Sequence, residues 1–171
     1  MWGVVPRSVM KSKQATKEST AVAAASGGYP FGRYDHAMDA KKRLTIPALW
    51  RDLMGHPAYF YVVRDAKHPC LMLITKEEME VRIERLRNGA ISNPARSAAL
   101  RALGENSELV SVDAAGRIRI SDWLMAAAQL KGDVVFIGEG VKIEIWALAN
   151  KPKEKSFNGE AMQSALELLD F

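Results

Sequence analysis

The chain has 171 residues, 48% of them apolar and 26% charged, and this length suits one folded domain with an extension. Its formal net charge is +4, but residues 1–33 carry five basic side chains against one acidic one, and the rest carries 19 of each sign. That balance excludes a uniformly basic nucleic-acid clamp. No apolar run of about 18 residues occurs, so no membrane-spanning helix is expected. The single cysteine excludes an internal disulfide framework and favours a cytosolic protein.

Residues 1–33 are interpreted as a disordered, basic N-terminal tail, because they are polar and then rich in Ala, Ser and Gly without a sustained apolar period. A secretory signal fits poorly, since the short Ala-rich patch 21–25 follows a long polar stretch. A transit peptide and an overextended start, with Met10 as the true first residue, remain alternatives. The lysines of the tail could also bind DNA non-specifically.

The first half of the fold is expected to begin near Tyr34. Segments with alternating polarity or with β-branched and aromatic residues predict strands at 34–38, 43–46, 59–63 and 70–74. The first two would be the arms of a β-hairpin around a charged loop. A short helix, 48–54, is expected after Pro47, and its core-facing residues are Leu49, Trp50 and Leu53.

Two helices are expected between the halves. Thr75 and Glu78 form a capping-box pattern at the start of the first helix, which ends at Asn88-Gly89. Asn93-Pro94 starts the second helix, with Asn as the N-cap, and Gly104 is expected to stop it.

The second half is expected to repeat the plan of the first half. The predicted strands are 109–112, 117–120, 134–137 and 142–146. Ser121 is expected to cap a helix that runs through Leu130, and Asn158 to cap a last helix.

The segments Asp39–Ile46 and Asp113–Ile120 read alike although they lie far apart in the chain, which indicates a duplicated unit. An Asp that opens a tight turn accepts hydrogen bonds from backbone N–H groups two or three residues further on. The Arg at the end of each loop opens the next strand. Its guanidinium can bind a phosphate, or the O6/N7 edge of guanine, through two hydrogen bonds.

Together these features resemble the MraZ family of bacterial transcriptional regulators, over residues 34–171. The resemblance rests on the two D-x-x-x-R loops, on Ile46-Pro47, on the HPCL segment 68–71 and on the Asn-Pro-Ala segment 93–95. It implies an α+β fold in which tandem AbrB-like swapped-hairpin repeats form a small β-barrel with flanking helices. The repeats would span 34–104, with the connecting helices, and 105–171, with the C-terminal helix. It further implies a ring-shaped homo-oligomer.

The resemblance implies a DNA-binding transcriptional regulator that recognises closely spaced direct repeats upstream of the division and cell-wall gene cluster, in the cytoplasm and at the nucleoid. The expected DNA-binding residues are Lys41, Lys42, Arg43, Arg117 and Arg119. The expected loop-orienting residues are Asp39, Asp113 and Gly116. Lys42 stands where the second loop has Gly116, so a positive φ at this position would cost the first loop about 1 kcal/mol or more.

The alternative is an AbrB-like interaction module, such as an antitoxin or a chromatin-associated scaffold. An enzyme is not expected, because no catalytic or phosphate-binding motif is present. His68 and Cys70 could form a metal site or a nucleophile pair, but no second cluster supports one, and Cys70 is read as a buried strand residue. Neither a cofactor, a metal, a small-molecule substrate nor a membrane partner is predicted.

Overall fold

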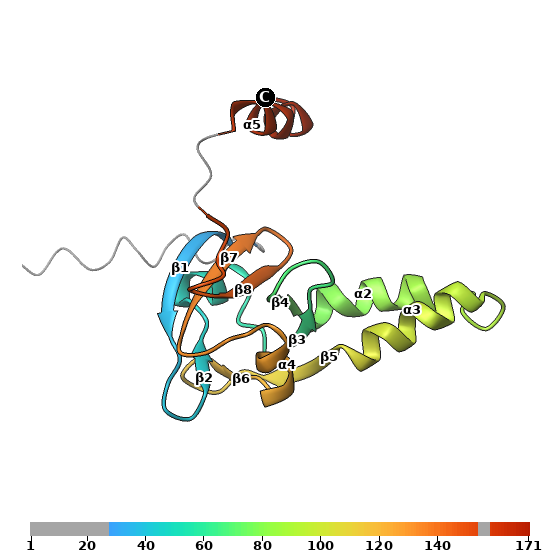
Figure 1. Cartoon of the computed structure of the whole chain (residues 1–171). Helices are drawn as coiled ribbons and strands as arrows, with labels where there is room; N and C mark the ends of the chain where they lie inside the picture. Colours follow the sequence, from blue (N-terminus) through green and yellow to red (C-terminus); the bar gives the residue numbers. More distant parts are fainter. Residues whose placement is uncertain (1–27, 154–157) are drawn as a thin grey trace, which may run out of the picture.

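The computed structural model describes residues 28–153 and 158–171, and these residues form a mixed α+β fold (Figure 1). The strands of the described residues are β1 (Phe31–Ala37), β2 (Arg43–Thr45), β3 (Tyr59–Arg64), β4 (Cys70–Thr75), β5 (Ser107–Ser111), β6 (Arg117–Arg119), β7 (Asp133–Glu139) and β8 (Ile143–Ala147). The helices are α1 (Ala48–Leu53), α2 (Lys76–Arg87), α3 (Pro94–Glu105), α4 (Asp122–Ala127) and α5 (Gly159–Leu168). Residues 1–27 of the tail expected at 1–33 lie outside the described residues, whereas its last three residues, 31–33, belong to β1 and pair with β7.

The strands of the two halves interlock. Six strands form one sheet in the order β1-β7-β8-β4-β3-β5, and β2 and β6 form a separate two-stranded ladder. Each strand of the first half pairs antiparallel with a strand of the second half: β1 with β7, β2 with β6, β3 with β5 and β4 with β8. Each half therefore supplies hydrogen-bond partners to the other, in addition to the β3–β4 and β7–β8 pairs within the halves.

Two expectations about the strands are wrong. The sheet formed by the described residues is not closed into a β-barrel. Its edge strands β1 and β5 do not pair with each other, and β2 and β6 form a separate ladder of three residues each. The segments on either side of the first charged loop also do not form a hairpin. Instead, β1 pairs with β7 and β2 pairs with β6.

The hydrophobic core is shared by the six-stranded sheet, the β2–β6 ladder and the short helices α1 and α4. Its largest fully buried side chains include Trp50, Phe60, Phe136, Leu44 and Ile118. Burying a side chain of this size contributes about 1.5–3 kcal/mol. Leu44 and Ile118 are partners at the centre of the ladder, so the core fixes the ladder from its inner side.

Helix α1 buries one side and exposes the other. Trp50 is buried and Leu53 packs against the core, as expected, but Leu49 is 56% exposed, so its expected core position is wrong. A helix of six residues has less than two turns, and only the residues on the side that meets the sheet can be buried.

Three helix N-caps follow the sequence prediction. The side-chain oxygen of each cap residue accepts a backbone N–H from the first turn, which satisfies donors that the helix itself leaves free. These are Thr75 with Glu78 N–H (3.3 Å), Asn93 with Ala95 N–H (3.0 Å) and Asn158 with Ala161 N–H (3.1 Å).

Two helix ends differ from the prediction. Gly104 lies inside α3, which continues to Glu105. Ser121 occupies the N-cap position of α4, but its hydroxyl makes no cap hydrogen bond, and α4 ends at Ala127, before Leu130. The chain leaves this helix through Gln129, whose φ of 56° is incompatible with a continuing α-helix.

Helices α2 and α3 lie side by side and project together from the sheet (Figure 1). No helix within residues 28–153 and 158–171 is long and apolar enough to cross a membrane.

Candidate nucleic-acid interface

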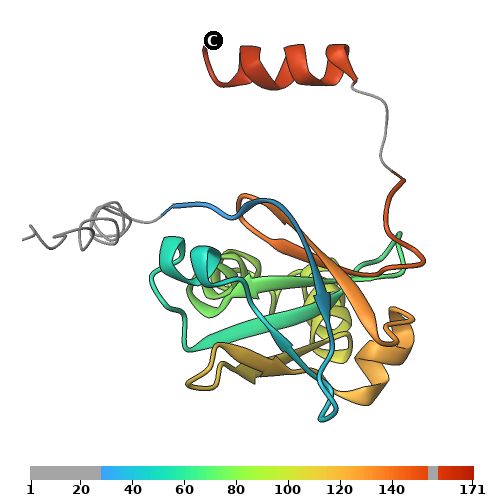
Figure 2. The ribbon, with the colours of Figure 1, turned by 90° about the vertical axis from the view of Figure 1, so that its left-hand side faces the viewer.

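Loop A, residues 39–43, is a tight turn organised by the carboxylate of Asp39. Its Oδ1 accepts the backbone N–H groups of Lys41 (2.8 Å) and Arg43 (2.9 Å), and its Oδ2 accepts the Nε–H of Arg43 (2.7 Å). Two backbone hydrogen bonds close the turn, from Lys42 N to Asp39 O (2.9 Å) and from Asp39 N to Arg43 O (3.0 Å). Figure 2 shows loop A as a tip at the lower end of the body.

Loop B, residues 113–117, has the same hydrogen bonds at equivalent positions. Asp113 Oδ1 accepts the N–H groups of Ala115 and Arg117 (both 2.9 Å), and Oδ2 accepts the Nε–H of Arg117 (2.7 Å). The turn is closed from Gly116 N to Asp113 O (2.8 Å) and from Asp113 N to Arg117 O (2.9 Å). The sequence repeat is therefore also a repeat of local geometry.

Both loop carboxylates are held in the ionised form. The backbone N–H of Arg43, then its side chain and the N–H of Lys41, lower the pKa of Asp39 from its ordinary value. The backbone N–H of Arg117, its side chain and the N–H of Ala115 lower the pKa of Asp113 in the same way. Hydrogen bonds to the charged form are the cause in both loops.

The two loops meet on the β2–β6 ladder, whose strands lie side by side in Figure 1. Arg43 is the register partner of Arg119, and Thr45 is the partner of Arg117. Since Leu44 and Ile118 face the core, these four residues lie on the opposite, outer side, here called the ladder face. Arg43 Nη1 also lies 4.0 Å from Asp113 Oδ2, which links the two loops directly.

The other expected DNA-binding residues lie around this face. Lys41 and Lys42 are exposed on loop A, and Arg119 is exposed on β6. Arg119 Nη1 donates to the backbone oxygen of Lys41 (3.3 Å), and Lys42 Nζ pairs with Asp122 Oδ1 (3.0 Å). The structure therefore brings five cations from two distant segments to one small surface.

Lys42 adopts the backbone conformation that its counterpart Gly116 adopts. Its φ is 57°, and that of Gly116 is 76°. The left-handed region costs a residue with a side chain about 1–2 kcal/mol, and glycine very little. Loop A therefore carries a strain that loop B avoids.

Two residues next to the ladder were not singled out by the sequence. His36 Nε2 accepts the backbone N–H of Thr45 (3.1 Å) and so ties β2 to β1. Arg51 of α1 lies against Gly116 of loop B, since a Cβ on Gly116 would be 2.5 Å from Arg51 Nε and Nη1. No local motif marks either residue, because the His36 contact joins two strands of the first half that do not pair with each other, and the Arg51 contact joins the two halves.

His68 and Cys70 do not form a nucleophile pair. Cys70 is fully buried, and this burial raises the pKa of its thiol to about 12, so the reactive thiolate is disfavoured. His68 Nδ1 lies 3.3 Å from Asp65 Oδ1, and its ring packs against Trp146. Within the part of the chain that the structure describes, no group of three or more His, Cys, Asp or Glu side chains could hold a metal ion.

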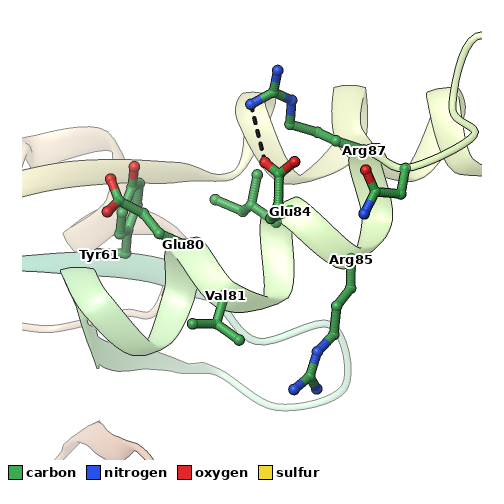
Figure 3. A pocket seen from close by; sticks show the side chains of 8 residues that line it. Tyr61, Glu80, Val81, Glu84, Arg85 and Arg87 are labelled. Carbon is green, nitrogen blue, oxygen red and sulfur yellow. Dashed lines mark hydrogen bonds and ion pairs between the residues drawn. The ribbon is translucent and has the colours of Figure 1, made fainter.

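A hollow of about 700 Å³ lies along α2, near Tyr61 of β3 (Figure 3). Glu84 and Arg87 pair with each other at 3.2 Å on its rim, while Arg85 points to the other side of the helix. Opposite charges that pair along a helix are typical of a solvated surface. The hollow therefore resembles a surface groove more than a catalytic centre.

The amino-acid sequence of this chain is similar to those of one family of known proteins. Residues 104–150 match the family model described as "MraZ protein, putative antitoxin-like". The chain is 32% identical over 145 residues to the transcriptional regulator MraZ of Heliobacterium modesticaldum, which covers 82% of this chain and 97% of that protein. It is 30% identical over 117 residues to MraZ of Clostridium tetani, covering 68% and 80% of the two chains. With MraZ of Mesoplasma florum it shares 29% identity over 139 residues, covering 81% and 94%.

Proposed function

The chain belongs to the MraZ family of transcriptional regulators, and on this premise we propose that it binds double-stranded DNA sequence-specifically through the ladder face and loops A and B. One observation carries the proposal. Two loops with the same hydrogen bonds, from distant parts of the sequence, meet on one ladder whose outer side presents Arg43, Arg117 and Arg119.

The arrangement suits DNA because each loop presents an oriented guanidinium. Asp39 and Asp113 hold the Nε of Arg43 and Arg117, and the remaining N–H groups of an arginine can bind phosphate or the edge of guanine. In this proposal Lys41, Lys42 and Arg119 add contacts to phosphates, which position the protein without reading sequence. Asp39, Asp113 and Gly116 keep the loops in shape.

Self-association forms the second part of the proposal. One copy offers few cations on a balanced body, so binding by a single copy would fall in the non-specific range of ~10⁻⁴–10⁻⁶ M. A ring-shaped homo-oligomer would present the loops repeatedly to closely spaced direct repeats, and linked contacts raise affinity without new contacts.

The proposed target is the DNA upstream of the division and cell-wall gene cluster, including the gene of this protein, and the proposed place of action is the nucleoid in the cytoplasm. The reciprocal pairing of the two halves also fits tandem AbrB-like repeats of the swapped-hairpin type.

The test is fluorescence anisotropy with a duplex from the upstream region and a scrambled duplex of the same composition. Arg43→Ala and Arg117→Ala should each weaken binding to the upstream duplex about 10- to 100-fold, since one two-bonded arginine contact to a base contributes about 1–3 kcal/mol. Arg101→Ala, at an exposed position of α3, is the matched control. Unchanged binding by both loop variants would reject the ladder face as the DNA site.

A second candidate is an interaction module, either an antitoxin or a scaffold, and the wording of the matching family model favours the antitoxin. Purification of the full chain with a bound protein partner, together with no affinity for either duplex, would support this candidate.

A further inference from the structure

Loops A and B differ in charge at two aligned positions, Lys41 against Ala115 and Lys42 against Gly116, and the second of these has a structural counterpart elsewhere in the chain. When the two repeats are aligned on Asp39 and Asp113, Lys42 of loop A corresponds to Gly116 of loop B, and Asp122 corresponds to Ala48. Loop A therefore has a cation at this position, paired with Asp122 at 3.0 Å. Loop B has Gly116 in place of the cation, and the residue that corresponds to the carboxylate is the uncharged Ala48.

The guanidinium of Arg51 fills the empty position in loop B. Its Nε and Nη1 occupy the space that a side chain on Gly116 would take, since a Cβ there would lie 2.5 Å from both atoms. Arg51 is held in place through Ile46. Arg51 Nε donates to the Ile46 oxygen (3.3 Å), and Ile46 N–H donates to the Gly116 oxygen (3.0 Å).

The charge at Arg51 is also less compensated than the charges of Lys42, Arg43 and Arg117. Lys42 pairs with Asp122, Arg43 with Asp39, and Arg117 with Asp113. Within the described residues Arg51 makes no ion pair, and its Nε hydrogen bond goes to a neutral carbonyl. A phosphate oxygen could therefore bind this guanidinium without displacing a paired carboxylate.

We propose that Arg51 is a phosphate-binding residue of the DNA interface and gives loop B the cation that Lys42 gives loop A. This rests on the DNA binding proposed above. At this position the two loops then offer a cation by different routes: loop A from its own strained residue, loop B from a helix of the other half. The contact is to the sugar–phosphate backbone because Arg51 comes from α1, beside the loop, whereas Arg43 and Arg117 leave from the ladder strands.

A phosphate contact has a recognisable signature in the salt dependence of binding. Arg51→Gln keeps most of the side-chain length and a donor for the Ile46 oxygen but removes the charge. It should weaken binding to the upstream and scrambled duplexes by similar factors, and reduce the slope of log K against log salt by about 0.9 for each copy that contacts DNA. Arg101→Gln on α3 is the matched control and should leave the slope unchanged.

A charge-relocation experiment separates DNA contact from a structural role. Arg51→Ala alone should reduce the slope of log K against log salt by the same amount as Arg51→Gln. Adding Gly116→Lys to Arg51→Ala gives loop B the pattern of loop A, with a lysine in the backbone conformation that Lys42 already adopts, and should restore the slope and affinity. Thermal melting followed by circular dichroism checks that the variants fold.

The outcomes distinguish this inference from the function on which it rests. Loss of binding in Arg43→Ala and Arg117→Ala, with an unchanged salt slope in Arg51→Gln, would overturn the role of Arg51 and leave the DNA interface standing. Normal binding in Arg43→Ala and Arg117→Ala would instead remove the proposed interface itself. A reduced slope in Arg51→Gln that the relocated lysine restores would support the assignment.

Discussion

Loops A and B share their backbone and differ in their surroundings. Each has an Asp that accepts two backbone N–H groups and one arginine Nε–H, and each has a residue of positive φ at the fourth position. In loop A that residue is Lys42, paired with Asp122 of α4; in loop B it is Gly116, covered by Arg51 of α1. The comparison teaches that the Asp and the left-handed position define the turn, while its charge can come from elsewhere.

The loops also differ in how their carboxylates are shared. Asp113 Oδ2 holds Arg117 at 2.7 Å and lies 4.0 Å from Arg43, whereas Asp39 pairs with Arg43 alone among the residues that the structure describes. Asp113 therefore connects the two arginines across the ladder face.

The largest expected effect tests whether loops A and B are stabilised together, as one cooperative unit. Leu44→Ala or Ile118→Ala should lower the free energy of unfolding by about 2–5 kcal/mol, because each side chain is fully buried at the centre of the ladder. Urea denaturation measures this loss. Hydrogen exchange should rise in both loops for either variant, and a rise confined to the loop next to the substituted strand would show that the loops are independent.

The second-largest effect is a difference in stability between substitutions at Gly116 and at Lys42, the two loop residues of positive φ. Gly116→Ala should cost about 1–2 kcal/mol, because alanine is strained at a φ of 76° and its Cβ must displace the Arg51 guanidinium. Lys42→Gly should change stability by less than about 1 kcal/mol, because relief of strain offsets the loss of an exposed ion pair. Urea denaturation measures the free energy of unfolding of both variants, and equal losses would contradict the difference between the loops.

The third effect depends on pH. The folded-state pKa values of Asp39 and Asp113 are lowered, so both groups stabilise the fold above the ordinary value of 3.8, and this stabilisation is lost as the pH falls through the lowered values. The double variant Asp39→Asn/Asp113→Asn should melt below the wild type at neutral pH. The difference should shrink as the pH drops below about 4. Thermal melts across this range check the prediction, and a constant difference would contradict it.

The smallest effect concerns the ion pair that only loop A has. Asp122→Asn should change stability by at most about 1 kcal/mol, since the pair is exposed. It should tighten DNA binding about twofold to threefold at low salt, because Lys42 no longer pairs with a carboxylate. Anisotropy measures this, with Asp133→Asn at the exposed start of β7 as control. Weaker binding would indicate that Asp122 positions Lys42 for DNA instead of competing for it.

The sequence by itself determined the features that depend on neighbouring residues. The caps of α2, α3 and α5 follow from Thr75, Asn93 and Asn158, because a cap hydrogen bond spans only two or three residues. The turns of the two loops could be predicted for the same reason, since each Asp and the backbone N–H groups that it binds lie within four residues of each other. The repeated sequence pattern then marked the loops as a pair.

Only the tertiary structure decided which segments pair across the halves. Local alternation predicts β1 and β2 as strands but carries no information about their partners, so the hairpin expected around loop A proved to be two pairings with β7 and β6. The sheet is open because its edge strands β1 and β5 do not pair with each other, and local alternation does not predict which strands will be edges. The place of Arg51 depends on the same interlocking, because long-range pairing of the halves brings α1 of the first half onto loop B of the second.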